Sequence, residues 1–494
     1  DGSQTYRFDY DDQGNVRTYT AGNGSGSTFN YDHANKIKDL VVGTSNSILL
    51  SERYEYDQAG NRTKIKHEGA GGKVTETNFV YDPINQLLNE ALPNGTSKSY
   101  TYDGFGNRTS VKVVENGKET KSIAATFNDG NQLVKFGNES LTYDANGNRT
   151  SDGKYKYTWN EDDQIVAITK QGESNAFATY KYDENNRRIE KSVNGQVTRY
   201  FYDGDSINPL YETDGSGNVL RQYVYSTSGA RLAMKSKGQT LYYHYNPRGD
   251  VIAMTDQNRE VVATYEYDSW GNVLKSDAKG IAADNPFGYA GYMYDKEIGM
   301  YYLIARYYNP DHGVFLSVDP DPGDDDDPVT QNGYTYVDNN PVMLIDPDGN
   351  IPIFPLLVVA ARIAAPHIAR HAAKQAAKKA TKRAILEANK RAGARAEELA
   401  KSALQEKGYN VLGSQVSIRT SKGIRRVDHL VRTPRGKLLA VEVKAGNARR
   451  SKMQLIKDQL MRKKGGRITG KNAPKDLKGQ IHKIRTVVVS PKSK

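Results

Sequence analysis

The chain contains no cysteine, which excludes disulfide bonds and cysteine-ligated zinc sites. Long apolar runs are also missing. The most apolar stretch, residues 351–365, is shorter than the roughly 20 residues of a spanning helix, and it is broken by Pro352 and Pro355 and carries Arg362. We therefore expect no stable membrane span and interpret this stretch as a packing segment. The opening residues, DGSQTYRFDY, lack the pattern of a signal peptide, and we interpret the chain as part of a longer protein.

Acidic residues become scarce after residue 350. Residues 351–494 hold 35 Lys and Arg against 8 Asp and Glu, a formal charge of +27, whereas the residues before them carry −16. Tyrosine divides at the same point, since 33 of the 34 tyrosines precede residue 350 and Tyr409 alone follows it. A chain of 494 residues is long for a single core. The sequence therefore predicts separate modules, of which the basic one suits a polyanion such as nucleic acid.

A short motif recurs through the first module. YDQAGNRT begins at Tyr56, YDGFGNRT at Tyr102 and YDANGNRT at Tyr143, with looser copies at Tyr182 and Tyr267. A second type, YDPINQLL, FNDGNQLV and WNEDDQIV, is interleaved with the first. Repeats at such short spacing are typical of architectures in which one unit cannot bury its apolar face alone and must stack on its neighbours.

Each copy has the pattern of a strand, a tight turn and a second strand. In the copy at Tyr56, Asp57 can accept hydrogen bonds from the turn backbone and Gly60 supplies a positive φ. Asn61 is a residue type that tolerates the left-handed region, and we expect the next strand to begin at Arg62. Stacked hairpins of this kind predict a long continuous sheet with aromatic residues on one face.

These motifs resemble the YD repeats of the RHS family, particularly those of the wall-associated proteins of Gram-positive bacteria, over about residues 6–350. The resemblance implies a mainly β shell, a spiral sheet that encloses a C-terminal toxin. Exposed tyrosines would also suit a carbohydrate-binding surface, but we expect most of them to pack between hairpins.

Residues 289–350 resemble the RHS core-associated segment that closes such a shell. The matching motifs are ARYYNPDHGVFLSVDP from Ala305, NGYTYVDNNP from Asn332 and DPDG from Asp346. In relatives this segment cuts the chain after the DPxG motif, and the resemblance assigns Arg306, Asp319 and Asp346 to an aspartyl-type self-cleavage near residue 350. The chain departs from that pattern in having Asn350 where a bulky apolar residue usually follows the glycine. The alternative is that these aspartates cap turns.

The tail begins with a region rich in Ala, Lys and Arg, for which we expect helix. Two strands follow, joined by the turn TPRG. If this hairpin is centred near Arg435, Asp428 and Glu442 lie directly opposite each other, with Cβ atoms about 5 Å apart. Lys444 projects from the same face as Glu442, and Val441 and its neighbour Val443 point the other way, into a core.

Two carboxylates beside a lysine suit phosphodiester hydrolysis. They can hold a hard cation such as Mg²⁺, which polarises the phosphate and lowers the pKa of a bound water. Lys444 can orient that water or stabilise the charge of the pentavalent state. Glu397 on the preceding helix and Gln454 on the following one are placed to complete the site. The alternative is a surface salt bridge between Glu442 and Lys444.

The order helix Glu, Asp, Glu-x-Lys, helix Gln resembles the PD-(D/E)xK nuclease superfamily over about residues 391–490. The superfamily's proline before the Asp is replaced by Val427. The resemblance implies a restriction-endonuclease-like α/β domain, with Mg²⁺ or another divalent cation bound by Asp428, Glu442 and Glu397. The implied catalytic residues are Asp428, Glu442, Lys444, Glu397 and Gln454. The basic residues that we expect to contact phosphates are Arg449, Arg450, Lys452, Arg462, Lys463 and Lys464.

We therefore expect a YD-repeat shell over residues 1–288, a closing segment over 289–350, a basic helical linker over 351–390 and a nuclease toxin domain over 391–494. The implied protein is a secreted or wall-bound antibacterial toxin of the contact-dependent growth inhibition type. Its tail would cleave tRNA, or DNA, in the target-cell cytoplasm, and a cognate immunity protein would protect the producer. The alternative is a cell-surface adhesin whose basic tail anchors to anionic cell-wall polymers, a role that has no use for paired carboxylates.

Overall fold

The chain folds as two units, Asp1–Pro366 and His367–Lys494, each of which is considered by itself. The computed structural model describes residues 4–44, 47–68, 72–319, 331–350, 352–353, 400–444, 450 and 452–489. In these ranges no helix has both the length and the hydropathy to cross a bilayer.

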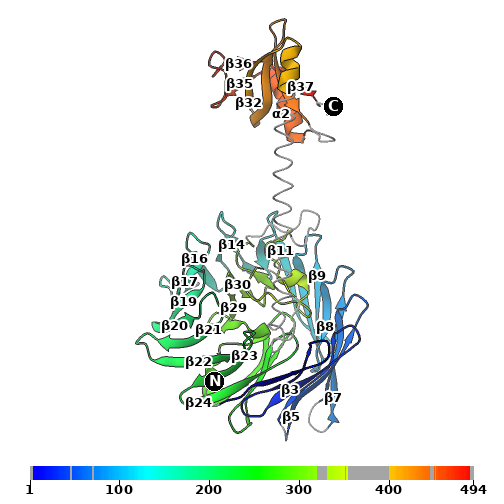
Figure 1. Ribbon diagram of the computed structural model, residues 1–494, viewed down its shortest axis with the longest axis vertical. Coiled ribbons are helices and arrows are strands. Elements are labelled where there is room, and N and C mark those ends of the chain that lie inside the picture. The colour runs from blue at the N-terminus through cyan, green and yellow to red at the C-terminus, as the bar shows by residue number, and fades with distance from the viewer. Residues whose placement is uncertain are drawn as a thin grey trace. The chain divides into compact units, whose positions relative to one another are not determined.

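Antiparallel strands, each paired with the next in sequence, build the first unit (Figure 1). The 13-stranded sheet contains β1 (Arg7–Tyr10), β2 (Val16–Thr20), β3 (Gly26–Tyr31), β4 (Ile37–Gly43), β5 (Ile48–Tyr56), β6 (Arg62–Glu68), β7 (Val74–Tyr81), β8 (Leu87–Ala91), β9 (Thr96–Tyr102), β10 (Arg108–Glu115), β11 (Lys118–Phe127), β12 (Leu133–Phe136) and β13 (Glu139–Ser140). The first half of the 14-stranded sheet contains β14 (Thr142–Tyr143), β15 (Arg149–Ser151), β16 (Tyr155–Trp159), β17 (Ile165–Lys170), β18 (Ala178–Tyr182), β19 (Arg188–Val193) and β20 (Gln196–Tyr202). Its second half contains β21 (Pro209–Asp214), β22 (Val219–Tyr225), β23 (Arg231–Ser236), β24 (Gln239–Tyr245), β25 (Val251–Thr255), β26 (Val261–Tyr267) and β27 (Val273–Ala278).

The turn after each YD motif follows the predicted chemistry. Asp57 Oδ1 accepts a 2.8 Å hydrogen bond from the Asn61 amide, Gly60 has a φ of 92°, and β6 begins at Arg62. Asn61 has no positive φ, because the glycine before it already supplies it. The Asn61 side chain instead donates a 2.8 Å hydrogen bond to Asn85 Oδ1 in the next turn. Asn85, with a φ of 69°, stands in its own turn where Gly60 stands in the first motif type.

The tyrosine of the YD motif ties neighbouring strands together. At the end of β5 the Tyr56 hydroxyl donates a 2.7 Å hydrogen bond to the carbonyl of Ile37, the first residue of β4. Other strand-end tyrosines make the same bond to the first residue of the preceding strand, and they are Tyr31, Tyr81, Tyr102, Tyr182, Tyr202, Tyr225, Tyr245 and Tyr267. These tyrosines therefore fix each strand to the one before it.

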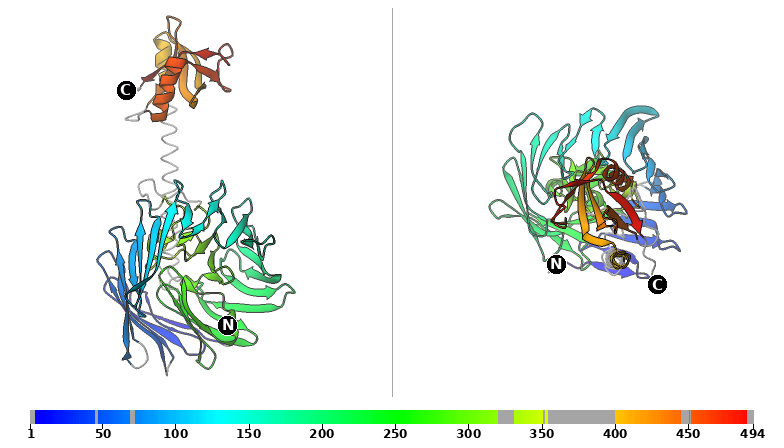
Figure 2. Two further views of the ribbon diagram at one scale, coloured as in Figure 1. Left: turned by 180° about the vertical axis from the view of Figure 1, so that it is seen from behind. Right: turned by 90° about the horizontal axis from the view of Figure 1, so that it is seen from above.

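The segment after β27 lies inside the curve of the two sheets (Figure 2). Its elements are η2 (Gly280–Asp284), η3 (Tyr289–Gly291), β28 (Met293–Asp295), β29 (Met300–Leu303), β30 (Arg306–Asn309), β31 (Val314–Phe315) and η4 (Val337–Asn339). Its aromatic rings supply much of a buried cluster that also contains Trp270 from the turn before β27.

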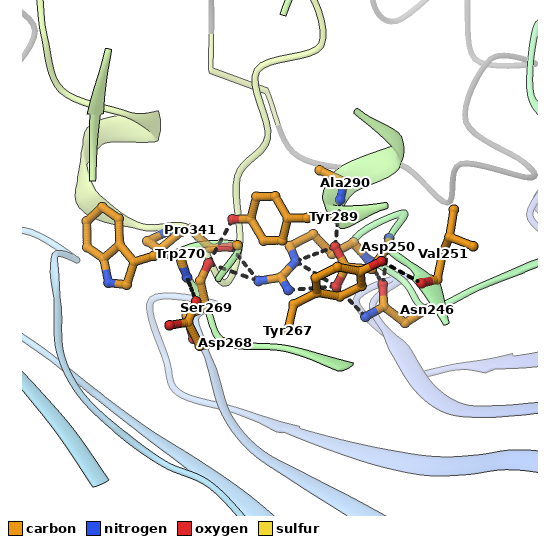
Figure 3. A network of polar contacts seen from close by, with 12 residues as sticks. Asn246, Asp250, Val251, Tyr267, Asp268, Ser269, Trp270, Tyr289, Ala290 and Pro341 are labelled. Atoms are coloured by element: carbon orange, nitrogen blue, oxygen red, sulfur yellow. Dashed lines mark hydrogen bonds and ion pairs between the residues drawn. The ribbon is translucent and has the colours of Figure 1, made fainter. Parts of the chain in front are cut away.

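Buried arginines of the repeats hold this segment to the shell. Arg248 forms an ion pair with Asp250 and donates 3.0 and 3.2 Å hydrogen bonds to the carbonyls of Pro341 and Ser269. Figure 3 shows that Asp250 also accepts a hydrogen bond from the Ala290 amide, and that the Ser269 carbonyl accepts one from the Tyr289 hydroxyl. In the same way Arg188, which is fully buried, forms an ion pair with Asp295 of β28. Because a buried charge is costly without a partner, the Arg188–Asp295 pair fixes where β28 docks, and the Arg248–Asp250 pair adds hydrogen bonds to Pro341 and Ala290.

The second unit is a mixed six-stranded sheet with order β36-β35-β32-β33-β34-β37. Its elements are β32 (Asn410–Thr420), β33 (Gly423–Arg432), β34 (Leu438–Val443), α2 (Lys452–Lys464), β35 (Gly466–Thr469), β36 (Ile481–His482) and β37 (Arg485–Val489), and residues 400–406 are helical. Only β34 and β37 pair in parallel. The predicted fold class, a mainly β repeat shell followed by an α/β domain, is confirmed.

We predict that Tyr56→Phe destabilises the first unit by about 1 kcal/mol, since it removes one hydrogen bond and leaves the ring in place. The measurement is urea unfolding followed by circular dichroism. Tyr10→Phe is the matched control, because Tyr10 ends β1, which no described strand precedes, and its side chain is exposed. Equal unfolding midpoints for the two variants would contradict this role of the hydroxyl.

Candidate active site

The β33–β34 hairpin has the register that its spacing predicts. His429 pairs with Val441 and Leu430 with Ala440, so the next position in this register sets Asp428 opposite Glu442. Glu442 is only 3% exposed, whereas Asp428 is partly exposed. The hairpin therefore brings the two predicted carboxylates to neighbouring positions on adjacent strands.

Three donors contact the buried carboxylate of Glu442. Lys444 Nζ lies 3.0 Å from Oε1, and Gln454 Nε2 of α2 lies 3.4 Å from the same oxygen. Arg425 Nη2 donates a 2.8 Å hydrogen bond to the other oxygen, Oε2. The structure thus brings Lys444 and Gln454 to Glu442, as the sequence predicts, and adds an arginine that the sequence analysis missed.

A break in the strand alternation explains why Arg425 was missed. Arg425 and Asp428 are three residues apart, so strict alternation would put them on opposite faces. Gln415 of β32 has a φ of 54°, and neither Gln415 nor Asp428 belongs to the regular pairing between β32 and β33. The sequence does hold one signal for a buried arginine. Arg425 and Arg426 are adjacent, and because successive strand residues point to opposite faces, one of the two must face inward.

The carboxylate of Asp428 is held at the same irregularity. Its Oδ2 accepts a 2.6 Å hydrogen bond from the Val443 amide, and its Oδ1 accepts a 3.2 Å hydrogen bond from Gln415 Nε2. Beside it, His429 is buried and its Nδ1 lies 2.9 Å from the hydroxyl of Ser414. His429 therefore has a packing role in β33, while Asp428 is oriented by the backbone of β34.

The placement of the core corrects one expectation. Val441 is buried as predicted, at 2% exposure, but Val443 is only partly buried. The main apolar cluster of this unit instead includes Ala440 and Met461 of α2. Since Ala440 is two residues from Glu442, the core lies on the carboxylate's own face of β34. Successive residues Ala440 and Val441 are both buried, so both faces of β34 are covered at this point, which strand alternation alone does not predict.

The other predicted site residues fall into three groups. Glu397 and Arg449 lie outside the described residues, as does the side chain of Lys452. Arg450 Nη1 lies 2.9 Å from Asp458 Oδ2, so this predicted phosphate contact is engaged in an ion pair. The last turn of α2 carries three predicted phosphate contacts, Arg462, Lys463 and Lys464.

The donor set fits a hard divalent cation. Carboxylate oxygens are the ligands that Mg²⁺ prefers, and Asp428 and Glu442 supply them from adjacent strands. No cluster of three or more His, Cys, Asp or Glu side chains occurs in the part of the chain that the structure describes. The third predicted ligand, Glu397, lies outside that part.

A second polar site lies at the end of the closing segment. Arg306 Nη2 lies 2.7 Å from Asp319 Oδ2 and 3.6 Å from Asp346 Oδ2. Arg306 Nε also donates a hydrogen bond to the Gly349 carbonyl, while Asp346 Oδ1 accepts 2.9 Å hydrogen bonds from the amides of Gly349 and Asn350. Burial lowers the pKa of Arg306, against the opposing charge of Asp319. Of the three residues predicted for self-cleavage, Arg306 and Asp346 therefore contact the Gly349–Asn350 peptide, and Asp319 contacts Arg306.

Two family matches divide the chain. Residues 22–342 match the family described as Teneurin YD-shell. The chain belongs to the teneurin YD-shell family. Residues 392–493 separately match the nuclease-related domain family, so this YD-shell protein carries a nuclease-related domain in its second unit.

Curated relatives of this YD-shell protein include tRNA nucleases. The chain is 52% identical over 366 residues to a tRNA3(Ser)-specific nuclease WapA of Bacillus spizizenii, and 53% identical over 351 residues to a tRNA(Glu)-specific nuclease WapA of Bacillus subtilis subsp. natto. These alignments cover 74% and 71% of this chain but 15% of each relative. The chain therefore spans about 15% of the length of these relatives.

A solved structure shares the shell fold. The crystal structure of TcdB2-TccC3-TEV matches with a TM-score of 0.59 and 23% sequence identity, covering 70% of this chain and 19% of that chain. At this identity the likeness concerns the fold alone, and it agrees with the two long antiparallel sheets.

We predict that Gln415→Val destabilises the second unit by about 1–2 kcal/mol, because a β-branched residue tolerates the left-handed region poorly. Gln415→Asn should cost less, since asparagine adopts that region readily. Urea unfolding of residues 351–494, followed by circular dichroism, gives the free energies. Arg419→Val on the same strand is the control, because Arg419 is exposed and its φ is not positive. A Gln415→Val variant as stable as the control would remove the argument for an irregular strand here.

Proposed function

We propose that the second unit is a divalent-cation-dependent nuclease. The observation that carries this proposal is the β33–β34 register, which pairs His429 with Val441 and whose next position sets Asp428 opposite Glu442, with Lys444 beside Glu442 Oε1. The match to the nuclease-related domain and the excess of basic residues in the tail support the same activity. A polyanionic substrate would be drawn to this unit by its charge.

The residues have distinct parts in this proposal. Asp428, oriented by the Val443 amide, and Glu442 would hold the cation, with Glu397 as the third ligand implied by the resemblance. When bound, Mg²⁺ would act as a Lewis acid on the phosphate and lower the pKa of a bound water. Lys444 offers a cationic hydrogen-bond donor for the charge that develops on the phosphate oxygens.

The substrate class follows from charge and resemblance. Arg462, Lys463 and Lys464 in the last turn of α2 provide cations for a phosphate backbone, so binding would weaken as salt rises. The WapA relatives are named as tRNA nucleases, which favours tRNA over DNA as the substrate. The shell would carry the nuclease as part of a secreted antibacterial toxin, with cell-wall polymers as partners in the producer and a cognate immunity protein that blocks the tail.

Glu442→Gln in residues 351–494 should lower the rate of nucleic-acid cleavage by at least about a hundredfold, because the loss of a catalytic electrostatic contact is of this size. The assay compares total tRNA and plasmid DNA, each with Mg²⁺ and with EDTA, and we expect tRNA to be cut first. Glu406→Gln is the matched control, since Glu406 is an exposed glutamate of the same unit. Cleavage that survives both EDTA and Glu442→Gln would exclude this mechanism.

We also propose that the closing segment cuts the chain between Gly349 and Asn350. Arg306 lies against the Gly349 carbonyl oxygen, where negative charge develops when water adds to the carbonyl carbon. Asp346 lies against the Asn350 amide, the nitrogen that must gain a proton as it leaves. Asp319 pairs with Arg306 and holds its guanidinium in place. The positive φ of Gly349, 79°, together with its contact to Leu303, explains why glycine stands there.

Asp346→Asn should leave the chain intact, whereas the unmutated chain yields a fragment that ends at Gly349 and another that begins at Asn350. Mass spectrometry of the purified protein measures both. Asp338→Asn in the same segment is the control, because asparagine tolerates the left-handed conformation of Asp338, with its φ of 52°. An unmutated chain that stays intact, or an Asp346→Asn variant that is still cut, contradicts the proposal.

A further inference from the structure

Arg425 is the most completely surrounded cation of the second unit's site. It is 3% exposed, and its three guanidinium nitrogens all donate hydrogen bonds. Nε bonds Asp458 Oδ1 of α2 at 2.8 Å, Nη2 bonds Glu442 Oε2 at 2.8 Å, and Nη1 bonds the Arg426 carbonyl. Burial opposes its charge, but the hydrogen bond to Asp458 and the nearby Glu442 raise the pKa of Arg425 above its usual value.

This arrangement gives the two oxygens of Glu442 different surroundings. Oε2 belongs to Arg425, while Oε1 lies near Lys444 and Gln454. The departure of the guanidinium is costly, because it bridges two buried carboxylates and each would lose one cationic partner: Glu442 would keep Lys444, and Asp458 would keep Arg450. A cation that reaches Glu442 therefore competes for Oε1, where Lys444 is 18% exposed and Gln454 lies 3.4 Å away, more readily than for Oε2, which the 3% exposed Arg425 holds.

Coordination chemistry makes this restriction selective. Ca²⁺ takes six to eight oxygen ligands at about 2.3–2.6 Å and often binds a carboxylate through both oxygens. Mg²⁺ and similar small cations need near-octahedral geometry, accept single carboxylate oxygens and keep several waters. A glutamate that offers a single carboxylate oxygen therefore disfavours Ca²⁺ and suits Mg²⁺ and similar small cations.

We propose that Arg425 is a positioning residue that makes Glu442 a one-oxygen ligand and so sets the preference of the site for Mg²⁺ or Mn²⁺ over Ca²⁺. This inference rests on the proposed cation site at Asp428 and Glu442. Arg425 acts through Glu442 and does not itself touch the cation. Asp458 of α2 supports this role, because its ion pair with Arg425 holds the guanidinium in place.

Competition between cations on the full chain tests the proposal. Mn²⁺ binding is followed by electron paramagnetic resonance and Ca²⁺ is added as competitor, with the Glu442→Gln chain supplying the background from other carboxylates. Arg425→Gln should shift the ratio of Mn²⁺ to Ca²⁺ affinity toward Ca²⁺ by about tenfold or more, since Glu442 can then use both oxygens. Asp458→Asn should shift it in the same direction by less.

The matched control is Lys457→Gln. Lys457 Nζ donates a 3.0 Å hydrogen bond to the carbonyl of Ile424, next to Arg425, and contributes to neither carboxylate. This variant should keep the affinity ratio of the unmutated chain. Circular dichroism and melting temperature verify that each variant is folded.

The outcomes separate the two proposals. The role of Arg425 is overturned if the Arg425→Gln chain is folded and its ratio of Mn²⁺ to Ca²⁺ affinity is unchanged. Equal losses of both affinities give this same result, because an arginine with a merely structural role would affect both cations alike. If Arg425→Gln does not fold, an unchanged ratio in Asp458→Asn overturns it instead. If Glu442→Gln itself leaves Mn²⁺ binding unaltered, the cation site fails, and the proposed nuclease mechanism fails with it.

Discussion

Several buried arginines in this protein pair with buried carboxylates, and these groups lie where its parts meet. In the first unit, Arg188 of the repeats pairs with Asp295 of the segment that they surround, and the Arg248–Asp250 pair contacts that segment through the Pro341 carbonyl and the Ala290 amide. In the second unit, Arg425 joins Glu442 on β34 to Asp458 on α2. A buried carboxylate without such a partner would be unstable in its charged form. The same constraint therefore orders the closing segment and orients the carboxylate on which the proposed chemistry depends.

Much of the shell could be predicted from local patterns, because its repeats encode their own turns. The Asp57 and Gly60 roles and the start of β6 at Arg62 follow from residues within one motif. The two motif types fill the left-handed position with different residues, Gly60 in the first and Asn85 in the second. The acceptor of each tyrosine hydroxyl could not be predicted, because it lies on the preceding strand and depends on register between repeats.

The candidate site was predictable to the extent that its hairpin is regular. Symmetry about Arg435 sets Asp428 opposite Glu442, and the structure has this register. Arg425 escaped prediction because the backbone at Gln415 breaks the alternation on which face assignments rest. Its partner Asp458 lies on a helix 33 residues further along the chain, a contact that no local pattern encodes.

Soaking crystals of the protein with Mn²⁺ and recording anomalous diffraction tests the central claim most directly. The account predicts one manganese peak bound by Asp428 and by Oε1 of Glu442, with Arg425 still on Oε2. A peak elsewhere with none between these carboxylates, or a manganese that displaces Arg425 and takes both oxygens of Glu442, would contradict it.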